Sequence, residues 1–174
     1  MVNPDLKCLK ISDLGLSVNY NEYKVCCYGI IGTYTYMAPE IYTANDNLSD
    51  VKHKYNEKID MWSIGVILYN LLFMTYPFQD LDFQHLSTIK SQADKMSYVQ
   101  THFKFDINNI QNIDLDYLQY YLTLNCWLSG GAVELLNNLL EVDPDKRWSC
   151  RECLESEWFR DFTPPPSPNC ESTN

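Results

Sequence analysis

The chain has 174 residues, of which 45% are hydrophobic and 21% charged, and its formal net charge is -10. This length and composition are typical of one folded domain with a sizeable core, and the negative charge argues against a nucleic-acid partner or an anionic membrane surface, because both need clustered Lys and Arg. The seven cysteines are an odd number without the spacing of a disulfide framework, which favours reduced thiols.

The N-terminal segment Met1–Lys10 has no apolar run of signal-peptide length, so we expect a cytoplasmic or nuclear protein. Leu6–Ile11 alternates polar and apolar residues and predicts a short strand or hairpin. The triplet Asp13-Leu14-Gly15 follows, and then a stretch of weak periodicity up to Ala38-Pro39-Glu40. Connections of that length without evident structure tend to be functional.

Ile59–Phe73 is apolar around nearly its whole helical circumference, which predicts the buried central helix of the domain. Asn56 is the expected N-cap, and Tyr76-Pro77 would stop any continuation. A membrane-spanning helix needs roughly 20 apolar residues, and this run is shorter and contains Asp60 near its start. Trp62 is expected in the core rather than on a contact surface.

The C-terminal half contains weaker helix signals. We expect helices over Phe83–Lys90, Leu115–Leu122 and Gly131–Glu141, and a last one capped by Ser149 and extending through Phe159, with Glu152 completing a capping box. Cys150 and Cys153 form a CxxC, but no second pair or suitably spaced histidine accompanies it, so a chance spacing is favoured over a zinc site. Residues 163–174 are rich in proline and predict a disordered tail.

Four motifs, taken in order, resemble those of the C-terminal lobe of a eukaryotic protein kinase of the Ser/Thr type. They are Ile11-Ser12-Asp13-Leu14-Gly15, GTYTYMAPE from Gly32 to Glu40, DMWSIG from Asp60 to Gly65, and Asp143-Pro144-Asp145-Lys146-Arg147. The resemblance implies a mainly α fold, a kinase-like C-terminal lobe with a short N-terminal β-hairpin and no N-terminal lobe. Residues 1–162 would then be a partial kinase domain, from the activation segment to the last helix, followed by the tail.

The resemblance also implies a cofactor site. Asp13 matches the Asp of the DFG motif, whose carboxylate binds the Mg²⁺ that accompanies ATP. Gly15 would supply the permissive backbone of the same cofactor-binding turn, and Leu14 replaces the usual Phe. Thr33 matches the threonine that lies beside the substrate residue in Ser/Thr kinases, so a protein substrate is implied. The alternative for Asp13 is a turn residue with no ligand.

Two further matches are structural. By the resemblance, Glu40 pairs with Arg147 in the interior of the lobe, and loss of either partner would cost roughly 3–5 kcal/mol. Asp60 matches the aspartate that accepts hydrogen bonds from backbone amides of the catalytic loop. The alternative for Asp60 is a negative charge that favours the N-terminus of its helix.

The sequence shows no catalytic residue of the family. Its six glycines form no G-x-G-x-x-G, and no HRD loop with its base is present. Phosphoryl transfer depends on groups from both kinase lobes, so we expect this chain alone to be inactive. Two hypotheses follow: a Ser/Thr protein kinase seen in part, or a non-catalytic, pseudokinase-like binding or scaffold module. The sequence does not indicate an oligomeric state.

Overall fold

The computed structural model describes residues 2–3, 8–18, 32–43, 55–78, 81–105 and 129–161. Within this part the fold is mainly helical, as predicted. Its helices are α2 (Pro39–Thr43), α3 (Lys58–Phe73), α4 (Phe83–Thr88), α5 (Gln92–His102), α7 (Gly130–Leu139) and α8 (Cys150–Glu155), with short 3-10 turns η1 (Leu14–Leu16), η2 (Tyr34–Tyr36) and η5 (Glu157–Phe159). None of these helices is long and apolar enough to span a bilayer.

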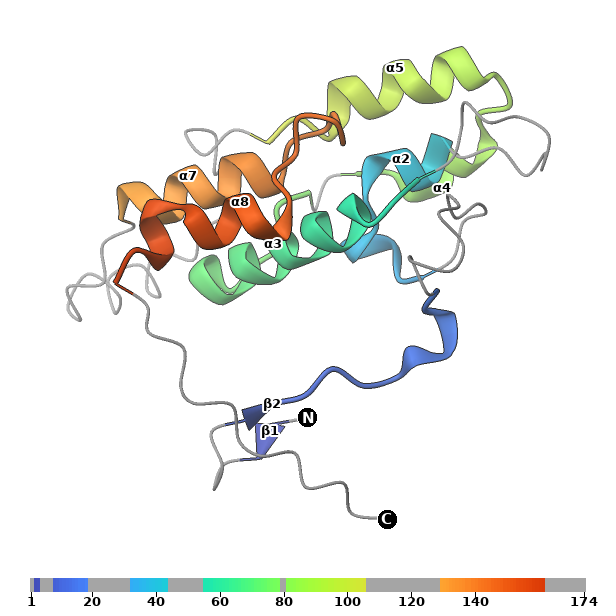
Figure 1. Cartoon of the computed structure of the whole chain (residues 1–174). Helices are drawn as coiled ribbons and strands as arrows, with labels where there is room; N and C mark the ends of the chain where they lie inside the picture. The colour runs from blue at the N-terminus through green and yellow to red at the C-terminus, as the bar shows by residue number, and fades with distance from the viewer. Residues whose placement is uncertain are drawn as a thin grey trace.

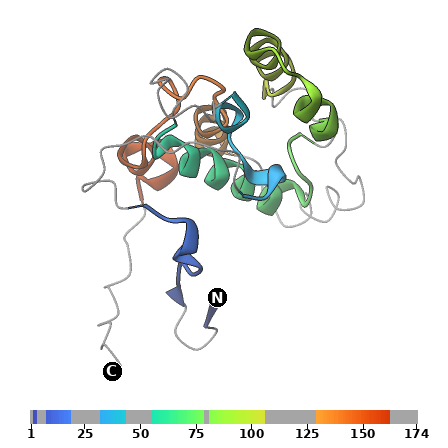
Figure 2. The same ribbon diagram turned by 90° about the vertical axis from the view of Figure 1, so that its right-hand side faces the viewer.

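Helix α3 lies at the centre of the fold, with α7 packed along it (Figure 1). Helix α2 lies beside α5, and η2 contacts α3. The N-terminal segment is separate: Figures 1 and 2 both show residues 8–18 running below the packed helices. In it, strands β1 (Val2–Asn3) and β2 (Cys8–Leu9) pair antiparallel, with Val2 opposite Leu9.

The boundaries of α3 agree with the predicted helix to within one residue. Asn56 helps its start, because its Oδ1 accepts a hydrogen bond from the backbone N–H of Lys58 at 3.0 Å. The cap position itself is Glu57, whose side chain makes no capping bond. At the other end Met74 adopts the left-handed conformation, with φ 52°, and its N–H bonds to Asn70 O. This left-handed turn, two residues before Tyr76-Pro77, ends the helix.

One face of α3 forms the core. Trp62, Val66, Tyr69 and Phe73 join a large apolar cluster that also contains residues of α2, α5 and α7. Met61 joins a smaller cluster with Leu135, Leu139 and Cys153. Trp62 is fully buried and stacks on Phe78, with ring centroids 5.3 Å apart. It is therefore a core residue, as predicted.

The prediction that α3 is buried all round is wrong for its other face. Ile64 and Ile67 are each 48% exposed, Leu71 is 62% exposed and Met74 is 61% exposed. These four residues recur at helical spacing and form one stripe, which we call the α3 stripe. The described elements pack only against the opposite side of the helix, so this stripe keeps its apolar side chains at the surface.

A close approach of α3 and α7 depends on Gly65. A Cβ at this position would lie 2.9 Å from both Leu139 Cβ and Leu140 Cδ2. We expect Gly65→Val to lower the free energy of unfolding by about 3 kcal/mol, because it overpacks this contact. Gly130→Val is the matched control, since no heavy atom lies within 4 Å of a Cβ there. Urea unfolding of both variants checks this, and equal losses would contradict it.

Other predicted helices have different bounds in the structure. The helix expected over Phe83–Lys90 ends at Thr88, and the one expected over Gly131–Glu141 spans Gly130–Leu139. The last helix has the predicted capping box of Ser149 and Glu152, but it stops at Glu155, and η5 follows. Helix α5 was not predicted. The helix expected over Leu115–Leu122 and the tail over residues 163–174 lie outside the described residues.

Candidate functional site

A buried ion pair joins the helix α2 to the turn that follows α7. Arg147 Nη1 donates to Glu40 Oε1 at 2.6 Å, and Nη2 donates to Oε2 at 2.9 Å. The Arg147 side chain is fully buried and that of Glu40 is 12% exposed. This parallel, two-bond geometry is the strong form of a charge-assisted interaction. The structure thus brings together the two residues that the motifs pair.

Arg147 also satisfies backbone acceptors around it. Nε donates to Glu141 O at 2.9 Å, Nη1 to Lys58 O at 2.9 Å, and Nη2 to Val142 O at 3.4 Å. Its guanidinium lies 5.0 Å from the centre of the Trp62 ring, a cation–π distance. The buried charge is therefore both paired and fully hydrogen-bonded, which is the condition for tolerating it in an interior.

Lys58 extends this network, and sequence reasoning missed it. Its Nζ donates to Arg147 O and lies 3.9 Å from Glu152 Oε2, so the start of α3 contacts the cap of α8. A bond to the backbone N–H of Ser149 is the main cause that lowers the pKa of Glu152. A lysine in the first turn of a helix opposes the helix dipole, and that mismatch was the available signal that Lys58 has a specific partner.

The segment around Thr33 is fixed by bonds from two helices. Ser63 Oγ on α3 donates to Tyr36 O at 2.9 Å, and Tyr42 OH on α2 donates to Tyr34 O at 2.8 Å. Burial raises the pKa of Tyr42, which keeps this hydroxyl a donor. Thr33 itself is exposed, and its carbonyl oxygen accepts a hydrogen bond from the backbone N–H of Tyr36 at 3.0 Å. A substrate residue could therefore approach Thr33 from solvent.

An aromatic pair borders the same segment. The Tyr36 and Tyr76 hydroxyls lie 3.1 Å apart, and their rings meet edge to face at 5.8 Å. The hydrogen bond to Tyr76 is the main cause that raises the pKa of Tyr36. Tyr76 comes from the turn after α3, so the end of the central helix also contributes to this surface.

Asp60 lies in the first turn of α3, and its carboxylate has no hydrogen-bond partner among the described residues. Its pKa is raised by partial desolvation and by the neighbouring Glu57 carboxylate. The position fits both interpretations of this residue, as an acceptor for a loop and as a charge favourable to the helix N-terminus.

Asp13 and Gly15 lie on the N-terminal segment, where residues 10–18 are all exposed. Asp13 has a left-handed backbone, with φ 63° and ψ 63°, and its side chain makes no capping bond to η1. Leu14, at the position of the family's Phe, is 64% exposed. Within the described part of the chain, no hydrogen bond or ion pair joins Asp13 to Asp60, Thr33 or Glu40.

The CxxC cysteines provide no metal site in the described structure. Cys150 is exposed and Cys153 is buried, and both are free thiols. Burial raises the pKa of the Cys153 thiol to about 11, so it is protonated at neutral pH and a poor metal ligand. Among the described residues, no three His, Cys, Asp or Glu side chains are grouped to hold a metal ion.

This arrangement defines a helical fold in which a buried Glu–Arg pair holds α2, and α2 and α3 together hold the loop that contains Thr33. The chain also matches the protein kinase domain model over residues 1–159. It therefore belongs to the protein kinase family, as its motifs indicate.

Curated proteins similar to this chain are Ser/Thr kinases by name. Serine/threonine-protein kinase D3 of Homo sapiens is 31% identical over 157 residues, which cover 88% of this chain and 14% of that protein. Serine/threonine-protein kinase 33 of Bos taurus is 30% identical, over 87% of this chain and 25% of its own length. CBL-interacting serine/threonine-protein kinase 8 of Arabidopsis thaliana is 31% identical, over 90% and 28%. The chain thus spans a minor part of these relatives.

Proposed function

We propose that this chain is the substrate-binding part of a Ser/Thr protein kinase, whose reaction is ATP- and Mg²⁺-dependent phosphoryl transfer to protein Ser or Thr. The observation that carries the proposal is the buried Glu40–Arg147 pair, which fixes α2, and the Tyr42 hydroxyl of α2 in turn bonds to the loop beside Thr33. Ser63 of α3 bonds to the same loop. The names of the similar proteins support the Ser/Thr class. We further propose that residues 1–162 act as one kinase unit in the cytoplasm or nucleus.

Asp13 fits the magnesium role in one respect. Mg²⁺ in phosphoryl-transfer sites is held by one or two carboxylates together with substrate phosphates, rather than by an all-protein cage. Asp13 offers one exposed carboxylate that makes no capping bond. Gly15 lies close to this carboxylate: a Cβ added at Gly15 would be 3.7 Å from Asp13 Oδ1. When bound, the metal would neutralise charge that develops on the transferred phosphoryl group.

Thr33 would position the acceptor. It is exposed at the start of η2, whose backbone is fixed from α2 and α3. A rigid loop of this kind lowers the entropy cost of aligning a peptide hydroxyl for transfer. The half-exposed Tyr36–Tyr76 ring pair beside it would contact the neighbouring residue of the substrate.

The second candidate is a non-catalytic binding or scaffold module. The exposure of the whole segment 10–18 favours it, because Asp13 and Leu14 are not enclosed by described residues. The size of the endogenous product separates the two functions. On an immunoblot, a product the size of this 174-residue chain favours the scaffold, and one about twice as large favours the kinase, since kinase catalysis draws groups from two lobes.

Mg-ATP is not expected to stabilise this chain by itself. A ligand raises the melting temperature of a protein only if it binds the folded state. A single exposed carboxylate does not provide enough contacts to bind a nucleotide. A thermal-shift titration with Mg-ATP should therefore give no change, and Asp13→Asn should melt at the same temperature. A shift of several degrees that Asp13→Asn removes would contradict the proposed inactivity of the chain alone.

The kinase activity itself is tested on the endogenous protein, purified with an antibody against an epitope of this chain. It should transfer labelled phosphate from ATP to Ser or Thr of a protein acceptor. Asp13→Asn should lower the rate by about a hundredfold or more, since a metal supplies several kcal/mol of transition-state stabilisation. Transfer only to tyrosine, or full activity of Asp13→Asn, would refute the assignment.

A further inference from the structure

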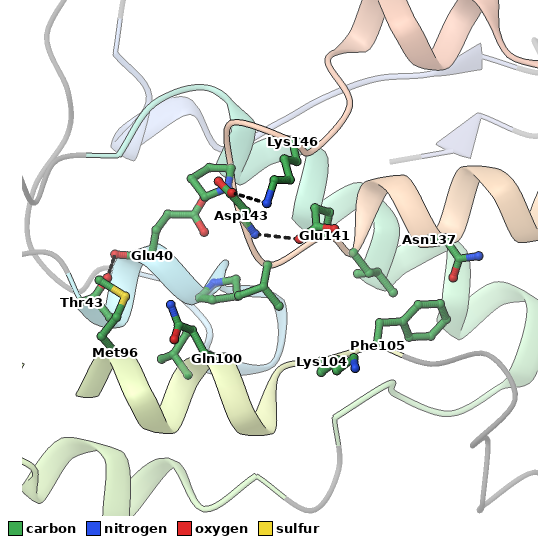
Figure 3. Close-up of a pocket in the computed structure, with 15 residues that line it drawn as sticks. Glu40, Thr43, Met96, Gln100, Lys104, Phe105, Asn137, Glu141, Asp143 and Lys146 are labelled. Atoms are coloured by element: carbon green, nitrogen blue, oxygen red, sulfur yellow. Dashed lines mark hydrogen bonds and ion pairs between the residues drawn. The ribbon is translucent and has the colours of Figure 1, made fainter. Parts of the chain in front are cut away.

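A cavity of about 770 Å³ lies beside the helix α2, and neither Asp13 nor Thr33, the proposed metal and substrate positions, lines it. Its walls come from α2, from α5 with Lys104 and Phe105 beyond its C-terminal end, and from α7 with the turn that follows (Figure 3). Its volume is within the range of natural small-molecule sites. All the residues that line it belong to the described part of the chain.

The lining of this cavity is mixed. Its apolar part comes from Met96, Val99, Phe105, Leu140 and Val142, and polar or charged side chains line the rest. Val99 and Leu140 are almost fully covered by their neighbours, whereas Met96 is 38% exposed at the rim. A lining of this kind suits an amphiphilic ligand, with an apolar body against the apolar part and a polar group against the rest.

The carboxylates that line the cavity already have partners. Glu40 binds Arg147 through both oxygens. Asp143 pairs with Lys146 at 3.1 Å, and this bond is the main cause that lowers its pKa. Glu141 Oε1 accepts the backbone N–H of Asp143 at 3.0 Å. Figure 3 shows the Asp143–Lys146 pair on the side opposite to α5.

Lys104 differs from the other charged groups of the cavity. It lies next to Phe105, just after α5, is exposed, and forms no ion pair with any described residue. The exposed amide of Gln100, one turn earlier on α5, also lines the cavity. A cation and a neutral amide thus lie at the α5 side of the cavity, next to its apolar part.

We propose that this cavity binds a small amphiphilic acid, that is, a molecule with an apolar body and a single carboxylate. The apolar body lies against Met96 and Phe105, and the carboxylate pairs with Lys104. A ligand in this position contacts α2 next to Glu40. The same helix bonds to the loop beside Thr33 through the Tyr42 hydroxyl. This site is separate from the proposed metal and substrate positions, and its test does not depend on kinase activity.

Decanoate is the probe, used below its micelle concentration in isothermal titration of the full chain. We expect saturable binding of one decanoate per chain, tighter than that of decanol or decylamine. Lys104→Glu should weaken decanoate binding about tenfold, because repulsion replaces an exposed ion pair. Gln100→Trp should abolish it by filling the entrance. Two controls should bind as the parent chain does: Lys10→Glu, an exposed lysine on the N-terminal segment, and Ala93→Trp, an exposed position on α5 outside the cavity.

Each outcome decides the proposal. Binding that survives Gln100→Trp would place decanoate elsewhere, for example on the α3 stripe, and overturns the site. Equal or tighter binding of decylamine, or no effect of Lys104→Glu, overturns the acid and its pairing with Lys104. Absence of saturable decanoate binding refutes the proposal outright. Far-UV circular dichroism of each variant verifies that the helices are retained, and the paired controls correct for general effects of a new Trp or Glu.

Discussion

Arg147→Met is expected to lower the free energy of unfolding by about 3–5 kcal/mol, which is the cost of leaving one partner of a buried ion pair uncompensated. The Glu40 carboxylate would keep its place in the interior, at 12% exposure, without a cation. Three backbone carbonyls would lose their donor as well. Urea unfolding followed by far-UV circular dichroism measures this, because the signal does not depend on Trp62 beside the guanidinium.

The matched control is Lys146→Met, one residue earlier. Its ion pair with Asp143 has side chains that are 74% and 42% exposed, and such pairs contribute at most about 1 kcal/mol. The double variant Glu40→Gln with Arg147→Met should recover part of the loss, because a buried neutral amide costs less than a buried charge. A single-variant loss below that of Lys146→Met would show that the pair does not hold α2.

The chain alone is expected to self-associate through the α3 stripe. The four residues Ile64, Ile67, Leu71 and Met74 form a continuous apolar surface on a helix that carries no charge between Met61 and Phe73. Contiguous exposed apolar patches of this kind drive association in water. Light scattering of the purified chain should give a mass above that of the monomer, and the excess should grow with concentration.

The double variant Ile67→Glu with Leu71→Lys should shift the chain toward the monomer. It breaks the stripe without changing net charge, and a Glu followed four residues later by Lys supports a helix. Leu154→Lys is the control, since this residue is 57% exposed on α8 and outside the stripe. A parent chain that is monomeric throughout, or equal effects of both variants, would contradict the role of the stripe.

The elements that the sequence predicted best have strong local signals. The uninterrupted apolar run specified α3 to within one residue, and the Ser149–Glu152 capping box specified the start of α8. Helix α5 was missed because its residues, QADKMSYVQTH, are mostly polar. It is anchored instead by Val99 and by Phe103, the residue after its last turn, both buried in the core. Its cap is also local: Ser91 Oγ accepts the Asp94 N–H at 3.3 Å.

The exposed face of α3 could not be predicted in the same way. Apolar character all round a helix indicates that neighbours are favourable on every side, but it does not say which segments supply them. The family resemblance paired Glu40 with Arg147, and the structure shows the two side chains bonded in the interior, where a carboxylate requires a cation. An exposed carboxylate is solvated by water and needs no partner in the protein. The metal role of Asp13 and the loop-holding role of Asp60 therefore stay predictions.

The partner that fixes α2 comes 107 positions later in the sequence. During synthesis, at about 5–20 residues per second, roughly 5 to 20 seconds pass between the incorporation of Glu40 and that of Arg147. Throughout this interval Glu40 of the nascent chain has no Arg147 to pair with. The loop before α2 is therefore synthesised well before the arginine that anchors this helix, and the interval between them is the period when a chaperone would be most useful.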